Sequence, residues 1–295
     1  RMGVGVSQVI GVGGRDLTDK IGGIMMKQGI NMLTSDPSTE LIVLISKPPS
    51  TNVIPKIMAD AQESGKPVVV NFLGWKPSKK FENLYFTETI EDTAETVLSI
   101  VKNSTESFFV TKTSTLLEMA SNERARFSKN QKYIRGLFSG GSLCDEAIDV
   151  FRRYSLEIYS NVETSKKWFL KNSQISREHS CIDMGEEEFT QSRPHPMIDL
   201  SFRQERIQKE ANDPSVAVIL LDVVIGYGSH KNPAAGLAKT IQKEKENAIN
   251  NNRYLSVVAH VCGSHNDHQG LKIQEEYLQN AGALVLPTNA QAAKV

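Results

Sequence analysis

The sequence predicts an α/β fold of two domains, each built on a parallel sheet. Short β-branched, apolar runs alternate with segments of helical spacing, and this alternation begins again near residue 132. The length of 295 residues also suits two domains of ordinary size. Strands that alternate with helices are typical of βαβ units, in which helices cover both faces of the sheet. We therefore expect two doubly wound domains joined by a connector.

The first domain, residues 1–106, is expected to contain short strands that end in or near Gly, Pro or Ser. The apolar, β-branched runs are residues 4–12, 40–46 and 67–72. This half offers only about four of the strands that a doubly wound domain needs, and the missing unit is the first one. Arg1-Met2-Gly3 is neither an initiator Met nor a signal peptide, so we expect the chain to begin inside a domain.

Helices of the first half and the connector are predicted from apolar spacing and charge. Helices are expected over residues 20–34, 52–63 and 90–101, the last with Thr89 as its N-cap. Residues 107–131 are expected to form a connector that contains a helix over residues 116–126. Its basic side chains, such as Arg126 and Lys129, share no repeated face with aromatic residues. A solvated linker is therefore favoured over an interaction patch.

The second domain, residues 132–295, is expected to be a complete five-stranded domain of doubly wound type. Apolar runs predict its strands at residues 133–138, 157–159, 216–225, 254–261 and 283–286. Helices are predicted at residues 143–154, 202–212, 233–250 and 270–280, with another that begins near Asn289. Residues 161–196 are expected to be irregular and polar, apart from residues 181–184.

Composition excludes several classes of protein. The 34 Lys and Arg residues balance 34 Asp and Glu residues, which argues against a nucleic-acid binder that relies on bulk phosphate attraction. No apolar run approaches the roughly 20 residues that span a bilayer. The three cysteines are widely spaced and form no C-x-x-C pair, which favours a reducing, cytoplasmic location. We therefore expect neither a nucleic-acid partner nor a membrane partner.

The best local signal for a binding site follows the strand expected at residues 133–138. Ser139, Gly140, Gly141 and Ser142 form a Gly-Gly turn that leads directly into a helix. Glycines let the backbone approach a bound group, and the amides and dipole of a helix N-terminus favour an anion. A plain helix with a serine N-cap explains the same pattern. Because ligands of α/β sheets gather beyond the carboxyl ends of the strands, all four residues are candidate phosphate-binding or substrate-binding positions.

A related turn in the first half contains Gly13, Gly14 and Arg15. It lies between a strand-like run and a helix, but it is neither a dinucleotide-binding fingerprint nor a Walker A loop. Arg15 can pair with a phosphate or carboxylate in a forked geometry. It can equally form a surface salt bridge to Asp16 or Asp19, so both interpretations stay open.

A histidine between two prolines is the candidate catalytic residue. His195 lies between Pro194 and Pro196, and Arg193 precedes them. A rigid, exposed loop that presents His and Arg suits anion binding or proton transfer, so both are candidate catalytic side chains. The alternative is a solvated loop histidine without a role.

Other loops at the expected strand ends add positions that face a ligand. Gly226 and Gly228 follow the strongest strand and allow close approach of the backbone. His260, His265 and His268 lie close together in sequence but lack the spacing of a zinc motif. We therefore expect no metal site.

Six segments along the chain carry a resemblance to a known family. They read G-V-G-G-R-D-L, S-K-P-P, F-L-G-W-K-P, G-L-F-S-G-G-S-L-C-D-E, R-P-H-P-M-I-D and L-L-D-V-V-I-G-Y-G, in that order. In these segments the chain resembles the FdrA family, a relative of succinyl-CoA synthetase in the superfamily of NDP-forming acyl-CoA synthetases. The resemblance implies two flavodoxin-like halves, similar to the ligase domain of an α subunit and the C-terminal ligase domain of a β subunit. It also implies a fragment without the family's N-terminal CoA-binding domain.

The sequence departs from the synthetases at one important position. Succinyl-CoA synthetases carry phosphate on a loop histidine in a G-H-A-G-A segment, and the equivalent residues 72–77 contain no histidine here. His195 comes from the other half of the chain and does not match that motif. No ATP-grasp domain is visible either, so ligation through a standard phosphohistidine is not expected.

The resemblance implies a function in nitrogen catabolism. The FdrA family is linked to oxamate carbamoyltransferase, which interconverts oxalurate plus phosphate with oxamate plus carbamoyl phosphate during allantoin and purine degradation. The alternatives are an acyl-CoA synthetase for a carboxylic acid and a non-catalytic scaffold subunit. We expect no cofactor in this fragment, while CoA, a nucleotide or carbamoyl phosphate would belong to the full-length protein. Expected partners are a small acid or acyl phosphate and other protein subunits, and a homo-oligomer is compatible with the sequence.

Overall fold

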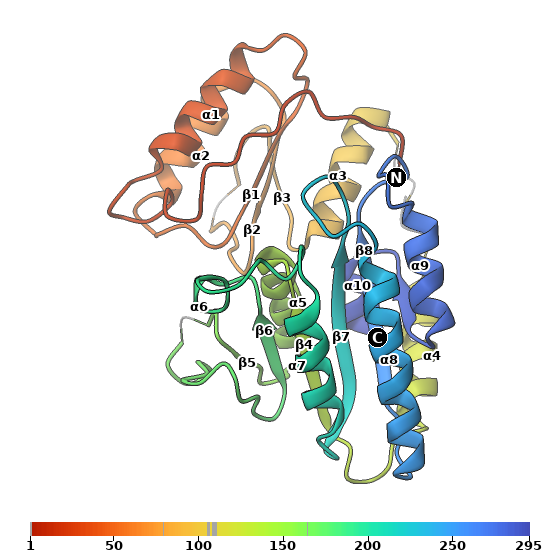
Figure 1. Cartoon of the computed structure of the whole chain (residues 1–295). Helices are drawn as coiled ribbons and strands as arrows, with labels where there is room; N and C mark the ends of the chain where they lie inside the picture. Colours follow the sequence, from red (N-terminus) through yellow and green to blue (C-terminus); the bar gives the residue numbers. More distant parts are fainter. Residues whose placement is uncertain (1, 79, 105–106, 108–110, 164) are drawn as a thin grey trace. The chain divides into compact units, whose positions relative to one another are not determined.

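The computed structural model divides the chain into two compact units, Arg1–Val110 and Thr111–Val295 (Figure 1). The structure describes residues 2–78, 80–104, 107, 111–163 and 165–295. Both units combine helices with a sheet whose described strands all pair in parallel. The predicted α/β class with two parallel sheets is confirmed.

The first unit contains a three-stranded sheet in the order β1-β2-β3, formed by Ile42–Ser46, Val68–Phe72 and Leu84–Phe86. Helices α1, α2 and α3 span Ile24–Ser35, Ile54–Glu63 and Ile90–Lys102. Strand β2 is buried along its whole length, as expected for the middle of a covered parallel sheet. The predicted N-cap of α3 is confirmed, because the Thr89 hydroxyl accepts a hydrogen bond of 2.9 Å from the amide of Asp92.

Two short segments of the first unit differ from the sequence prediction. The strand expected over residues 4–12 is wrong, because this segment has no regular structure and leaves Val6 80% and Val9 84% exposed. β-Branched residues form a strand only where a neighbouring strand and a buried face receive them. The third strand is instead β3, which only three residues form and whose Tyr85 is exposed. So short a strand has no hydrophobic period that a sequence could reveal.

The second unit contains a six-stranded sheet in the order β5-β6-β4-β7-β8-β9. In chain order these strands are β4 Tyr133–Phe138, β5 Tyr159–Ser160, β6 Ser180–Asp183, β7 Val216–Val224, β8 Ser256–Cys262 and β9 Leu284–Leu286. Without the two-residue edge strand β5, the order is that of flavodoxin-like sheets. Strand β6 largely coincides with residues 181–184, the exception within the segment expected to be irregular, for which no strand is predicted. It is fully buried but has only four residues, two of them polar, which conceals it in the sequence.

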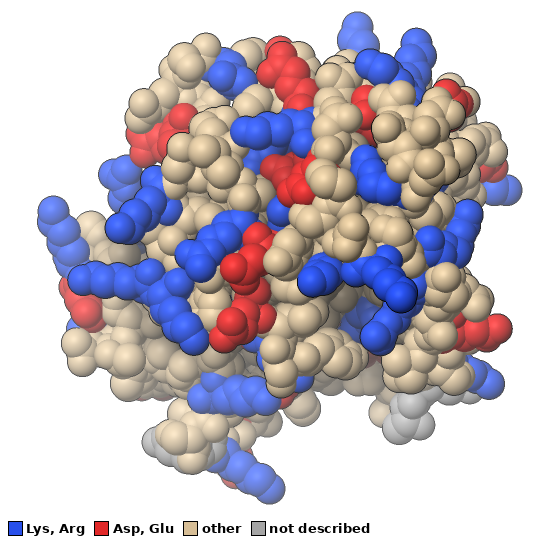
Figure 2. Space-filling view, turned by 90° about the horizontal axis from the view of Figure 1, so that it is seen from below, with Lys and Arg blue, Asp and Glu red and all other residues tan. Residues whose placement is uncertain are grey.

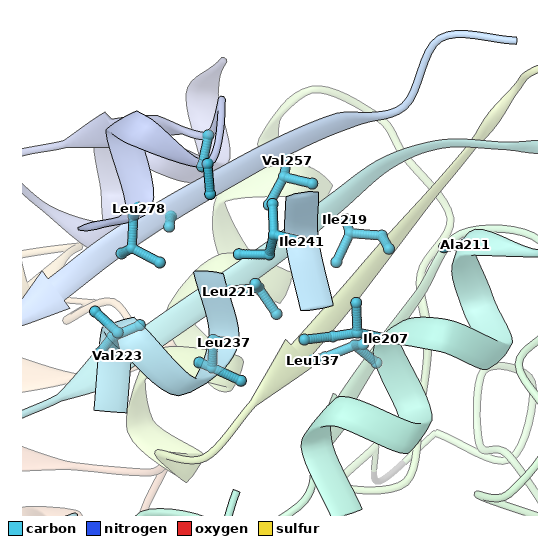
Figure 3. Close-up of a cluster of buried hydrophobic side chains, with 14 of the residues drawn as sticks. Leu137, Ile207, Ala211, Ile219, Leu221, Val223, Leu237, Ile241, Val257 and Leu278 are labelled. Carbon is cyan, nitrogen blue, oxygen red and sulfur yellow. The ribbon is translucent and has the colours of Figure 1, made fainter. Parts of the chain in front are cut away.

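Helices cover both faces of this sheet. They are α4 Thr113–Arg124, α5 Gly141–Arg153, α6 Glu187–Thr190, α7 Ser201–Ala211, α8 Pro233–Asn250, α9 Leu271–Asn280 and α10 Asn289–Lys294. Alternate strand residues enter separate cores, so Leu221 packs with α7 and α8 whereas Leu220 packs with α5 and α10. Figure 3 shows the first core, where Ile207 of α7 and Leu237 of α8 lie over the sheet.

Helix α4 falls within the predicted connector and packs on the second unit. Leu116 is 4% exposed and belongs to the same core as Phe138 and Ile148. Beyond the helix, the Arg126 guanidinium stacks 3.5 Å from the ring centroid of Tyr254. The Tyr254 hydroxyl also donates a hydrogen bond of 2.9 Å to Glu123. Residues 105–106 and 108–110 of the expected boundary lie outside the described residues.

The surface carries both signs of charge. Figure 2 shows Lys and Arg side chains spread over one face, with Asp and Glu between several of them. This mixture agrees with the zero net charge of the sequence. Among the described helices, not one has the length and apolar character needed to cross a membrane.

Candidate functional site

The topological switch point of the second unit lies at the carboxyl ends of β4 and β7. These two strands are neighbours, but the strands that follow them in the fold lie on opposite sides, β6 beside β4 and β8 beside β7. The chain therefore leaves the two strand ends in opposite directions, and in open α/β sheets such a switch point is the usual place for a ligand. The turn after β4 reaches this point, as the sequence predicts for Ser139, Gly140, Gly141 and Ser142.

Asp222 of β7 holds the first part of this turn. Its carboxylate accepts hydrogen bonds from the amide of Ser139 at 2.8 Å, from the Ser139 hydroxyl at 2.9 Å and from the amide of Gly140 at 2.8 Å. Asp222 is fully buried, so these are strong, charge-assisted bonds. The two amides thus already serve a carboxylate of the protein itself.

The next two amides of the turn open helix α5. The N-cap residue is Gly140, and no side chain caps the helix, so the alternative of a serine N-cap does not describe this turn. The amides of Gly141 and Ser142 belong to the first helical turn, where the backbone offers donors without acceptors in the helix. These amides and the helix dipole favour an anion there.

Arg203 of α7 neutralises Asp222 from inside the protein. Its side chain is 1% exposed, and Nη2 donates to the Asp222 carboxylate at 2.9 Å, to the Asp222 carbonyl at 2.7 Å and to the Leu137 carbonyl at 2.8 Å. The pair ties α7 to the ends of β4 and β7. A buried ion pair with these extra hydrogen bonds fixes geometry, because either charge alone would be costly to bury.

Neither member of this pair is among the site residues that the sequence predicts. Asp222 interrupts the strongest apolar strand, and a buried carboxylate in such a strand needs a partner. That is a usable signal for Asp222. Nothing in the sequence identifies Arg203 as the partner, because α7 contains several charged residues at helical spacing.

His195 lies against the same turn. A Cβ atom on Gly185 would lie 2.6 Å from His195 Nε2 and 2.9 Å from the Ser139 carbonyl oxygen, so the ring and the turn share one narrow space. Only glycine permits this approach. His195 Nδ1 accepts a hydrogen bond of 3.2 Å from the amide of Met197.

The pKa of His195 is lowered from its ordinary value of 6.5, and the main cause is burial of the half-buried ring. Asp222 opposes this effect on the pKa, while Arg203 adds to it. This lowered pKa favours the neutral imidazole at pH 7. Since Nδ1 accepts the Met197 amide, the neutral ring carries its proton on Nε2.

A second rim loop is fixed to the loop of His195. The amide of His230 donates to the Met197 carbonyl at 2.7 Å. The side chain of Gln269 holds Gly226. Oε1 of Gln269 accepts from the Gly226 amide at 3.1 Å, and Nε2 donates to the Gly226 carbonyl at 2.8 Å. Gly226 has φ +130°, a conformation that favours glycine. A Cβ on Gly228 would meet nothing within 4 Å.

The other predicted site residues have contacts of their own. Arg193 is near His195 in sequence, but its guanidinium packs 4.2 Å from the ring centroid of Phe202. Gly13, Gly14 and Arg15 belong to the first unit. There they line an open pocket of about 450 Å³, together with Val12, Asp16, Ile21 and Met25.

Asp16 explains the structure of that first-unit loop. Its carboxylate accepts from the amides of Met25 and Met26 at 2.9 Å each and so caps helix α1. Of the two charged residues that line the pocket, Asp16 is 4% exposed and therefore buried, whereas Arg15 is exposed. In the part of the chain that the structure describes, no group of three His, Cys, Asp or Glu residues could hold a metal ion.

Comparison with known proteins gives a family match and a curated relative. The model of the CoA-ligase family matches residues 137–295. Uncharacterized protein YahF of Escherichia coli (strain K12) is 41% identical over 287 residues, which are 96% of this chain and 55% of that protein. The chain therefore spans about half the length of this curated relative.

Solved structures are similar at a lower level. A dinucleotide-forming acetyl-coenzyme A synthetase 1 of Ca. Korarchaeum cryptofilum has 13% identity and a TM-score of 0.38, over 91% of this chain and 54% of that one. An ATP citrate lyase from Methanothrix soehngenii has 11% identity and a TM-score of 0.32, over 91% of this chain and 36% of that one.

Proposed function

Because the chain belongs to the CoA-ligase family, we propose that its second unit binds an acyl phosphate during the activation of a carboxylic acid. The observation that carries the proposal is the convergence of His195 and the first turn of α5 on Ser139, at the carboxyl ends of β4 and β7. A ring Nε2–H lies near the Ser139 carbonyl oxygen, and the first amides of helix α5 follow Ser139 directly in the chain, so two kinds of anion donor belong to the same turn.

Each of these groups has a task in such chemistry. The amides of Gly141 and Ser142 would bind phosphate oxygens, and the positive end of the helix dipole would favour their charge. His195 Nε2 would donate to an oxygen on which negative charge develops. Asp222 and Arg203 make no contact with substrate in this proposal and hold the turn in place.

The specific reaction that we propose is carbamoyl transfer. Oxalurate plus phosphate would give oxamate plus carbamoyl phosphate, together with partner subunits, in allantoin and purine nitrogen catabolism. The sequence resemblance to the FdrA family supports this choice. Carbamoyl phosphate also combines a compact acyl group with a phosphate that suits donors of this kind.

A second candidate is an NDP-forming acyl-CoA synthetase for a carboxylic acid, which the match to the CoA-ligase family favours. CoA and a nucleotide would then be ligands of the longer protein, because this chain spans about half of YahF. A cytoplasmic location suits either reaction, since both use phosphorylated metabolites.

One experiment separates these candidates. The full-length protein with its partners is incubated with oxalurate and phosphate, and in parallel with carboxylic acids, ATP and CoA. Carbamoyl phosphate formation supports the first function, and thioester formation supports the second. Complex activity that is unimpaired by His195→Ala would contradict both and would identify a scaffold subunit.

A further inference from the structure

The ring of His195 is oriented by the backbone around it. Its Nδ1 accepts from the amide of Met197 at 3.2 Å, within a turn in which the His195 carbonyl accepts from the amides of Ile198 at 2.8 Å and Asp199 at 3.1 Å. On its other side, the same Met197 residue accepts the His230 amide at 2.7 Å. These bonds hold residues 195–199 in one turn, and this turn places the Met197 amide at Nδ1.

This orientation has a chemical consequence for each ring nitrogen. A phosphoryl group on Nε2 requires a free lone pair there, and the proton of the neutral ring must then lie on Nδ1. An Nδ1–H would face the Met197 N–H, so two donors would oppose each other at 3.2 Å. A phosphoryl group on Nδ1 would displace the same amide. Neither nitrogen is suited to act as a nucleophile.

The groups around the ring favour a neutral donor instead. Asp222 of β7 and Arg203 of α7 form their own ion pair at 2.9 Å, so their charges largely cancel at His195. Asp183 of β6 is engaged by the amide of Gly185 at 2.9 Å. With Nδ1 occupied and the ring half-buried, Nε2–H is the polar group that His195 presents at the turn.

We propose that His195 is a neutral hydrogen-bond donor through Nε2–H to the phosphate or acyl oxygen of the ligand, and not a carrier of phosphate. The inference rests on the proposed function, because that function supplies the anion. It assigns no covalent step to His195.

Substitutions that copy one ring nitrogen at a time test this role. In His195→Gln the side-chain amide places its N–H near the position of Nε2–H, whereas His195→Asn reaches only the region of Nδ1. Binding of inorganic phosphate and of carbamoyl phosphate to the full chain is measured by calorimetry near pH 8. We expect His195→Ala and His195→Asn to bind roughly tenfold to a hundredfold more weakly, and His195→Gln to recover most of the loss.

His265→Gln is the matched control, since His265 is exposed on the loop after β8 and outside the cluster. Equal loss in His195→Gln and His195→Ala would overturn the donor role. A phosphate adduct on His195 would also overturn the donor role. It would appear by intact mass as an acid-labile adduct of the wild type after incubation with carbamoyl phosphate, and it would be absent from His195→Gln.

A second readout separates the inference from the proposed function. Nitrogen-15 NMR of the free protein reports which ring nitrogen of His195 is protonated. We expect the proton on Nε2, and a proton on Nδ1 would overturn the inference whatever the protein binds. Absence of phosphate and carbamoyl phosphate binding by the wild type would instead overturn the proposed function, and the donor role with it.

Discussion

At the scale of single residues, the Asp222–Arg203 pair makes the site sensitive to the loss of one charge. Both side chains are buried, and their atoms Oδ1 and Nη2 lie 2.9 Å apart. Arg203→Met or Asp222→Asn leaves an uncompensated buried group and should lower the free energy of unfolding by about 3–5 kcal/mol. The double variant should recover part of this loss. Urea unfolding measures all three, and single variants within about 1 kcal/mol of wild type would contradict the account.

Gly185 permits the approach of His195 to the turn. In Gly185→Ala the new methyl group would lie 2.6 Å from His195 Nε2, so ring or backbone must shift. We expect a loss of about 1–3 kcal/mol in stability and weaker phosphate binding, because the donor is displaced. Gly5→Ala is the control, since its Cβ would meet nothing within 4 Å. Phosphate affinity that is unchanged in Gly185→Ala would be evidence against the position of His195 in the site.

The two histidines with lowered pKa predict an acid-sensitive fold. The pKa of His195 and that of His179 are lowered from 6.5 mainly by burial. Between those lowered values and 6.5 the unfolded state binds more protons than the folded state, so stability rises with pH in this window. The contribution of these two histidines to the free energy of unfolding is fully present above their pKa in the unfolded state. It decreases when the pH falls below that value.

Urea midpoints measured between about pH 8 and pH 5 test this dependence. We expect the midpoint to fall as the pH decreases through 6.5, and His195→Gln to make the decline shallower. A midpoint that stays constant across this range would show that the histidines ionise equally in both states.

At the scale of elements, the packing of helix α4 on the second unit predicts that substitution of its buried face lowers stability. A solvated linker would show no such effect. Leu116 is 4% exposed in the core of the second unit, whereas Leu117 on the same helix is 60% exposed. Leu116→Ala should cost about 2–5 kcal/mol, and Leu117→Ala should have little effect. Hydrogen exchange should then accelerate in the peptides of the second unit for Leu116→Ala only. Equal behaviour of the two variants would mean that α4 is a solvated linker after all.

Long, regular elements are the ones that the sequence predicts well. Strand β7 has nine residues of nearly unbroken apolar character, and α8 has a period that continues through 18 residues. Strands β3 and β6 have three and four residues, too few for a period, and only the neighbouring strands define them. The strand that the sequence wrongly predicts at residues 4–12 has the same explanation. A local preference for strand does not supply the neighbouring strand that a sheet requires.

The site follows the same rule. The turn after β4 is predictable because a strand, two glycines and a helix are adjacent in sequence. The contacts that complete it are not local, since Asp222 lies 83 residues from Ser139, and Arg203 lies 64 residues from it. Only the parallel sheet brings these positions together. The role of His195 also needed the structure, because its tautomer depends on the amide of Met197.

At the scale of the whole molecule, the chain combines two α/β units with a family match that covers the second. The second unit holds the switch point, the buried ion pair and His195. The first unit holds a separate pocket wall with Arg15. The chain spans about half the length of YahF.

The central claim is an anion site at the carboxyl ends of β4 and β7. A crystal structure of the full chain with bound phosphate or carbamoyl phosphate tests it most directly. We predict an anion within hydrogen-bond distance of the amides of Gly141 and Ser142 and of His195 Nε2, with the Asp222–Arg203 pair intact. An anion bound elsewhere, with this turn empty at saturating ligand, would contradict the account.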